Sequence, residues 1–123
     1  MSDFAGRVRD IIIYGSEFTI FFDAQSRSVQ DRILWVLRLL MDLLWVPEKY
    51  LKHITGTDGI YELRVSAGNN IYRIFCFFDQ GRIVILLNAF QKKSQKIPIR
   101  YINKAKKLKQ EYYDEKKKQH RNS

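Results

Sequence analysis

The segment from Gly59 to Pro98 constrains the fold most strongly, because it contains three largely apolar, strand-like runs separated by short turns. Turn-forming residues stand at Gly68 and Asn69 and again at residues 79–81. Residues 83–87 are apolar at every position, which is typical of a strand covered on both faces. The segment therefore predicts three consecutive antiparallel strands of a small sheet.

Two arginines interrupt these apolar runs, one in each of the first two strands. A two-residue turn at Gly68 and Asn69 places Arg64 directly opposite Arg73. A two-residue turn at Asn69 and Asn70 would shift the pairing by two residues and still leave both arginines on one face. Only a three- or five-residue loop would place them on opposite faces. Glu62 lies on the same face as Arg64, because strand side chains alternate with period two. Facing guanidinium groups repel each other and are costly to bury unpaired, so this face is expected to be solvated or to receive an anion such as phosphate.

A lysine-rich loop, QKKSQK at residues 91–96, follows the third strand. Antiparallel connectivity returns it to the end of the sheet where Arg73 lies. Positive and negative side chains balance up to that loop, so residues 92–123 carry the whole formal net charge of +9. This asymmetry favours a polyanionic partner such as nucleic acid, although residues 116–123 are expected to form only a flexible basic tail. The lysines of the loop are Lys92, Lys93 and Lys96.

The spacing of apolar positions before this segment indicates further elements. Residues 9–14 predict a first strand, and Ser16 is expected to cap a short helix after it. A longer helix is expected to start at Ser28 and to be ended by Pro47. Residues 48–58 are expected to form a polar connector.

A final helix is expected after Pro98, which fits the first helical turn. With 123 residues the chain has room for one core, so we expect a single domain spanning residues 1–123. The predicted fold class is α+β: a mainly antiparallel sheet of about four strands, with two N-terminal helices and one C-terminal helix. The helices are expected on one side of the sheet and the arginines on the other.

Several protein classes are excluded by the sequence. No apolar run reaches the roughly 18 to 20 residues that span a bilayer. The first ten residues, MSDFAGRVRD, lack the apolar core of a secretory signal, so we expect a cytoplasmic protein. The single cysteine, Cys76, is expected in the core. His53 and His120 lack the company of a metal site, and we expect neither metal nor cofactor.

The strings GIYELRVSAGNNIYRIFCFF and IVILLNAFQKKSQKIP closely resemble the RelE/ParE superfamily of toxins from type II toxin-antitoxin pairs, especially the HigB-like, phage-derived branch. The resemblance covers roughly a third of the chain and implies the RelE-like microbial ribonuclease fold. It also implies a ribosome-dependent mRNA endoribonuclease that works in the ribosomal A site and is held inactive by an antitoxin, with a helix-turn-helix protein as the expected type. In such enzymes the ribose 2′-hydroxyl attacks the neighbouring phosphate without metal, which leaves a cyclic phosphate and a 5′-hydroxyl.

The resemblance also implies roles for single residues. Arg73 matches the central-strand arginine that clamps the phosphate in the transition state, and Arg64 matches a basic position that holds the scissile phosphate. Lys93 or Lys96 would stabilise the leaving group. The general base stays open, because Glu62 either takes a proton or balances the arginines, and a lysine of depressed pKa is an alternative. The expected RNA contacts are Lys52, Lys92, Gln91 and Phe90, the last of which suits base stacking and core packing equally.

Two other functions stay open at this point. One is inhibition of DNA gyrase in the manner of ParE, which needs a protein-binding surface and no phosphate clamp. The other is non-catalytic nucleic-acid binding, which is typical of chains whose exposed aromatic residues alternate with basic ones. The converging arginines and lysines favour the nuclease.

Overall fold

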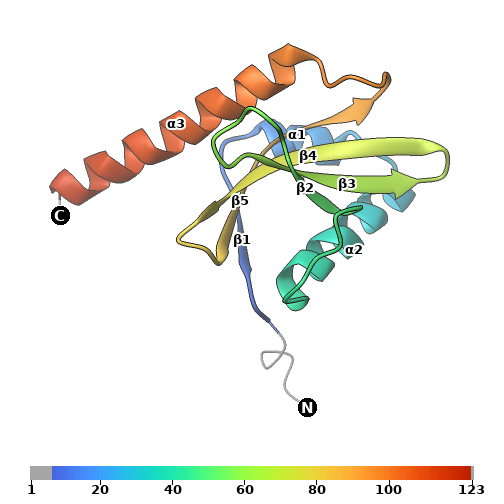
Figure 1. The fold of residues 1–123 in the computed structure, drawn as a ribbon, viewed down its shortest axis with the longest axis horizontal. Helices are drawn as coiled ribbons and strands as arrows, with labels where there is room; N and C mark the ends of the chain where they lie inside the picture. The colour runs from blue at the N-terminus through green and yellow to red at the C-terminus, as the bar shows by residue number, and fades with distance from the viewer. Residues whose placement is uncertain (1–6, 123) are drawn as a thin grey trace.

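The structure, a computed structural model, describes residues 7–122 and consists of a five-stranded sheet and three helices (Figure 1). The predicted α+β class is confirmed, with five strands in place of about four. Residues 1–6, which form part of the segment assessed for a secretory signal, lie outside the described residues. In chain order the elements are β1 (Asp10–Ile13), α1 (Glu17–Asp23), α2 (Arg27–Asp42), β2 (Leu51–His53), β3 (Tyr61–Ala67), β4 (Asn70–Asp79), β5 (Ile83–Lys92) and α3 (Ile99–Asn122).

The sheet has the order β1-β5-β4-β3-β2, in which β3, β4 and β5 form the predicted antiparallel series. Strand β1 runs parallel to β5 at one edge, and β2 pairs with β3 at the other. Gly68, with φ of +60°, occupies the left-handed conformation that the two-residue turn requires. Ala67 therefore pairs with Asn70, and Arg64 lies directly opposite Arg73. The first of the three turn alternatives is correct.

A β-bulge lies between β4 and β5, where the register shifts between Ile74 and Cys76. Beyond the bulge Arg73 is opposite Phe90. The bulge thus decides which β5 side chains share the arginine face.

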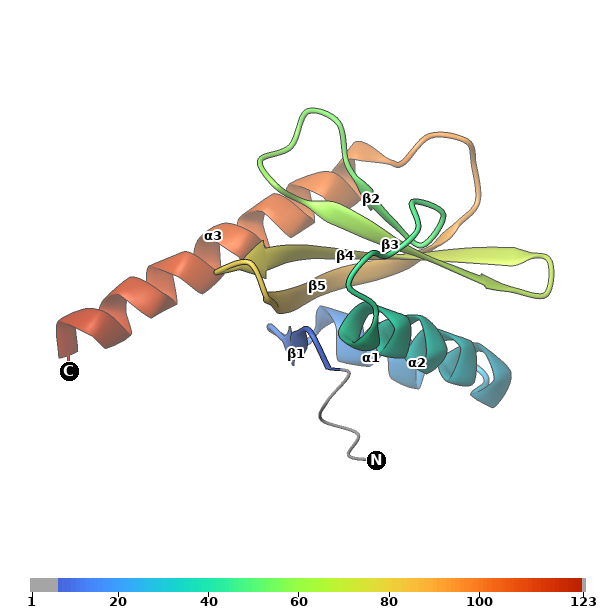
Figure 2. The ribbon, with the colours of Figure 1, turned by 60° about the horizontal axis from the view of Figure 1, so that its bottom comes forward.

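The helices cover both faces of the sheet, and this corrects the expectation that they lie on one side. Figure 2 shows α1 and α2 on one side of the sheet and α3 on the other. Each face has its own buried apolar cluster: Ile33, Leu40 and Leu63 belong to the first, and Phe75 and Leu108 to the second. The arginine face is therefore the face that α3 partly covers. Its uncovered remainder is available for a site.

Helix α2 buries Val29, Ile33 and Leu40 on one stripe, as its spacing predicts. Its ends differ from the prediction. Ser26, not Ser28, accepts the capping hydrogen bond, from the backbone N–H of Val29 at 3.4 Å.

The helix also ends at Asp42, well before Pro47. The Arg9 guanidinium donates hydrogen bonds to the backbone carbonyls of Leu40, Leu43 and Leu44 at 3.0, 2.6 and 3.0 Å. Because these bonds satisfy carbonyls that a longer helix would have used, the chain can leave the helix there without a proline.

Two smaller elements also differ from the prediction. Ser16 stands at the N-cap of α1, but its side chain makes no capping hydrogen bond. The connector at residues 48–58 contains β2, which pairs with β3 from Leu51 opposite Leu63 to His53 opposite Tyr61. A three-residue edge strand is too short to produce a recognisable alternation in the sequence.

Residues 116–122, expected as part of a flexible basic tail, instead continue α3 as helix. The buried Asp79 at the end of β4 accepts hydrogen bonds from the Tyr112 hydroxyl at 2.7 Å and from Lys116 Nζ at 2.5 Å. Burial alone raises the pKa of Asp79, but the hydrogen bonds from Lys116 and Tyr112 outweigh it and hold the pKa below its usual value. These hydrogen bonds hold the middle of α3 against the end of β4.

Cys76 is fully buried, as expected, and burial raises the pKa of its thiol to about 12. Across residues 7–122, no helix combines the length and the apolar character needed to cross a bilayer.

Candidate functional site

An open cavity of about 560 Å³ lies on the arginine face of the sheet, beside the start of α3. Strands β2, β3 and β4 form its floor, and the loop between β5 and α3 passes over the same side of the sheet (Figure 2). It brings together six of the residues singled out from the sequence: Lys52, Glu62, Arg64, Arg73, Lys92 and Lys96.

A buried carboxylate joins the two arginines at the floor of this cavity. Glu62 Oε2 accepts a hydrogen bond from Arg73 Nη1, and its other oxygen, Oε1, lies 3.9 Å from Arg64 Nη2. The side chains of Glu62 and Arg73 are 6% and 5% exposed, whereas that of Arg64 is 37% exposed. Glu62 thus offsets part of the repulsion between the arginines, and Arg64 keeps a face toward solvent.

Both arginines also carry buried donors without an acceptor. The Nε atoms of Arg64 and Arg73 are buried and have no hydrogen-bond partner among the described residues. An unsatisfied buried donor costs about 1–3 kcal/mol, more for a charged group. The planar guanidinium is suited to phosphate, and Arg64, whose side chain is 37% exposed, can present its accessible donors to an anion in the cavity.

Lysines surround the arginines from three different elements. Lys52 of β2 is directly opposite Glu62, and Lys92 lies two positions from Phe90, hence on the arginine face at the end of β5. Lys96 comes from the loop that follows. The lining carries five formal positive charges against the single negative charge of Glu62. The cavity is therefore suited to a polyanion.

Three candidates from the sequence lie elsewhere. Lys93 and Gln91 line a neighbouring cavity of about 350 Å³ next to α1, which shares Lys92 and Lys96 with the arginine cavity. Gln91, opposite Tyr72, is on the opposite face of the sheet from Arg73. Phe90 is on the arginine face but is buried, and its ring stacks on Tyr101 with centroids 4.1 Å apart. In this arrangement the Phe90 ring packs in the core, which favours the core alternative.

The sequence reasoning missed three polar residues that line the cavity: His53, Thr55 and Gln95. Thr55 and Gln95 lie in loops, where no pattern of apolar residues could have placed them. His53 lines the cavity, but its ring contacts that of Tyr61, with centroids 5.2 Å apart, and Tyr61 packs against the core on the side of α1 and α2. Because the sequence does not reveal β2, it also does not show that Lys52 and His53 point to opposite faces of the sheet.

Glu62 is buried and has both carboxylate oxygens turned toward arginines. This geometry favours its role as a counter-ion over that of a general base. Within residues 7–122, no three histidine, cysteine or acidic side chains are grouped so that they could hold a metal ion.

Residues 20–110, well over half of the chain, match the family described as phage derived protein Gp49-like (DUF891). The chain belongs to this family. The Gp49-like family is phage-derived, toxin-like and associated with toxin-antitoxin systems. The matched region contains β2 to β5 and the loop that carries Lys96, so it includes every residue of the arginine cavity. A comparison with curated proteins finds no match for the chain.

Proposed function

We propose that this Gp49-like chain is the toxin of a type II toxin-antitoxin pair and acts as a RelE/HigB-type, ribosome-dependent mRNA endoribonuclease. One observation carries the proposal: two opposed arginines with unpaired buried Nε donors lie at the floor of an open, strongly basic cavity. A protein-binding inhibitor of gyrase has no need of such converging cations.

In the proposed reaction the ribose 2′-oxygen forms a bond to the adjacent phosphorus and gives its proton to a base in the assembled ribosomal site. The bond between phosphorus and the 5′-oxygen breaks, and that oxygen takes a proton to leave as a 5′-hydroxyl. Arg73, held by Glu62, would bind two phosphoryl oxygens as negative charge develops on them. Arg64 is more exposed and would hold the incoming phosphate from the next strand.

Of the two lysines proposed for the leaving group, Lys96 lines the arginine cavity and Lys93 does not. Lys96 therefore takes this role in the proposal, because an ammonium group can stabilise or protonate the departing oxygen. Lys52 and Lys92 would contact the strand on either side of the scissile phosphate.

The proposed partners are the ribosomal A site with its mRNA, and an antitoxin, which in a toxin-antitoxin pair is encoded beside the toxin. The ribosome would supply what this cavity lacks, namely a rigid path that aligns the 2′-hydroxyl with the leaving oxygen.

Induced expression followed by mapping of mRNA 5′ ends tests the proposal. Wild-type chain should produce new ends within translated reading frames, and Arg73→Ala should produce none while remaining folded by circular dichroism. Lys93→Ala serves as the matched control, because it removes a nearby cation outside the cavity and should leave cleavage unchanged. Intact messages with accumulating broken DNA would instead assign the chain to gyrase inhibition.

A further inference from the structure

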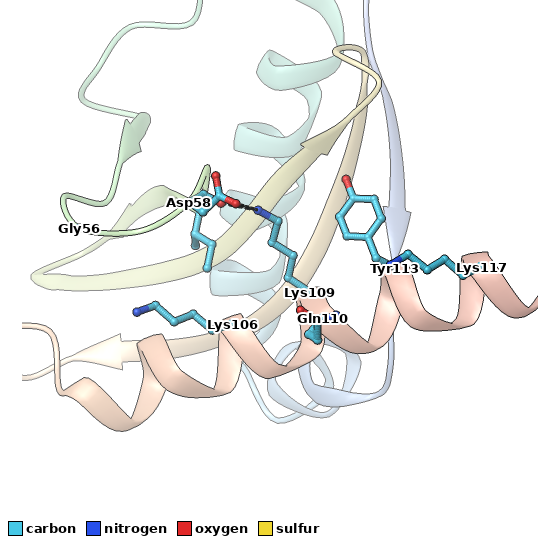
Figure 3. Close-up of a pocket in the computed structure, with 8 residues that line it drawn as sticks. Gly56, Asp58, Lys106, Lys109, Gln110, Tyr113 and Lys117 are labelled. Atoms are coloured by element: carbon cyan, nitrogen blue, oxygen red, sulfur yellow. Dashed lines mark hydrogen bonds and ion pairs between the residues drawn. The ribbon is translucent and has the colours of Figure 1, made fainter.

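A second basic groove, of about 690 Å³, runs between α3 and the loop that joins β2 to β3. Figure 3 shows Lys106, Lys109 and Lys117 along α3, with Tyr113 on the turn between the last two, and Gly56 and Asp58 on the facing loop. These lysines are spaced by three and then eight residues and fall on one side of the helix. The proposed cleavage site does not use them.

Helix α3 carries lysines inside and outside the groove but keeps its acidic side chains out of the lining. Its acidic residues are Glu111, Asp114 and Glu115, and none of them lines the groove. Asp114 accepts a hydrogen bond from Gln110 at 3.0 Å. Burial is the largest cause that raises the pKa of Tyr14 to about 12. A hydrogen bond to Glu115 and the negative charges of Glu115, Glu111 and Asp114 raise it further. The acids of α3 are therefore close enough to affect Tyr14, which follows β1 at the far edge of the sheet from β2. The side of α3 that faces the β2–β3 loop is left basic.

The groove holds one of its lysines in place. Lys109 Nζ donates a hydrogen bond to the Asp58 carbonyl and lies 3.8 Å from Asp58 Oδ2 and 5.4 Å from the centroid of the Phe77 ring. Its side chain is only 20% exposed, whereas that of Asp58 is fully exposed. Among the described residues that line the groove there are three lysines and one carboxylate, so a net positive charge is left after this pairing.

The lysine groove continues the arginine cavity. On α3, Ile102 lines the cavity and Lys106, one helical turn later, lines the groove. On the facing loop between β2 and β3, Thr55 lines the cavity and the next residue, Gly56, lines the groove. From Ile102 to Lys117 the helix rises about 22 Å, more than a single nucleotide can occupy. A strand whose phosphate lies at Arg73 would meet these lysines as it extends along α3.

We propose that the groove binds the phosphates of the single-stranded RNA that extends beyond the scissile phosphate. The identity of that strand rests on the proposed function, but the groove's affinity for RNA can be measured without cleavage. The lining favours RNA over an acidic protein, because it offers lysine point charges, its aliphatic residue Ile60 is only 1% exposed, and the partly exposed ring of Tyr113 is one on which a base can stack.

The test uses a short single-stranded RNA with 2′-O-methyl riboses, which cannot be cut by 2′-hydroxyl attack, and measures its binding over a range of salt concentrations. Lys106→Gln/Lys117→Gln should lower the slope of log affinity against log salt by about 1.4 and reduce affinity about tenfold at physiological salt. Lys109 is left intact because it also supports the fold. Asp58→Asn, which removes the negative charge of the groove, should tighten binding.

Lys107→Gln/Lys118→Gln is the charge-matched control, because these lysines lie on α3 but line neither the groove nor the arginine cavity. Equal slopes for the two double variants would overturn the proposal, as would polyglutamate binding as tightly as the RNA, which would assign the groove to an acidic protein. Failure of the proposed function gives a different result: no wild-type cleavage on ribosomes, with the difference in RNA binding between the two double variants retained.

Discussion

The buried ion pair between Glu62 and Arg73 makes a sharp prediction about stability. Both side chains are about 95% buried, and Glu62→Gln removes the charge while it keeps the shape and one acceptor oxygen. Breaking a buried pair by removing one partner costs about 3–5 kcal/mol, and the retained oxygen favours the lower end. We therefore expect the free energy of unfolding to fall by about 3 kcal/mol and the melting temperature by roughly 10 °C.

Chemical denaturation at neutral pH measures this change directly, with calorimetry for the melting temperature. Glu48→Gln is the matched control, because Glu48 is exposed and should change the free energy of unfolding by less than about 0.5 kcal/mol. Added inorganic phosphate should stabilise Glu62→Gln more than wild type, because two arginines then lack their counter-ion and phosphate can replace it. A Glu62→Gln variant as stable as the control, or insensitive to phosphate, would refute the reasoning.

Three further predictions concern the frame around the site. Asp79→Asn should destabilise the chain at neutral pH, because the pKa of Asp79 is lower in the folded than in the unfolded chain. The ionised carboxylate therefore contributes its full stability above the unfolded pKa of about 3.9 and loses that contribution as the pH falls through the folded pKa. The difference from wild type in urea denaturation should therefore shrink in acid, and a constant difference would contradict it. Ser26→Ala should cost about 1 kcal/mol in the same assay and Ser28→Ala clearly less; the reverse order would exclude the assigned cap. Cys76 should resist alkylation at pH 8 until the chain unfolds, and labelling of the folded protein at the rate of free thiol would show that the site is open.

The sequence was informative about the central hairpin because its turn chemistry and alternation agree. Gly68 and Asn69 favour a two-residue turn, and of the turns considered this one places Arg64 directly opposite Arg73. Connectivity then brings the lysine loop to the same end of the sheet, as Lys92 and Lys96 confirm. These arguments use residues close in sequence, where pattern and geometry are tightly linked.

Long-range arrangements could not be predicted in the same way. The end of α2 depends on Arg9, more than 30 residues away. The way in which the loop after β5 turns decides that Lys96 lines the arginine cavity whereas Lys93 does not. The position of Phe90 depends on a β-bulge without a sequence signature. The side of the sheet that α3 covers is set by packing of Phe75 and Leu108, which an apolar pattern leaves undetermined.

Cleavage of mRNA on purified ribosomes tests the central claim most directly. With a defined mRNA in the A site, the wild-type chain should produce fragments that end in a 2′,3′-cyclic phosphate and begin with a 5′-hydroxyl, and Arg73→Ala should reduce the single-turnover cleavage rate by at least about a hundredfold. Unchanged cleavage by Arg73→Ala, or fragments that begin with a 5′-phosphate, would contradict the proposal that the paired arginines form the catalytic phosphate site.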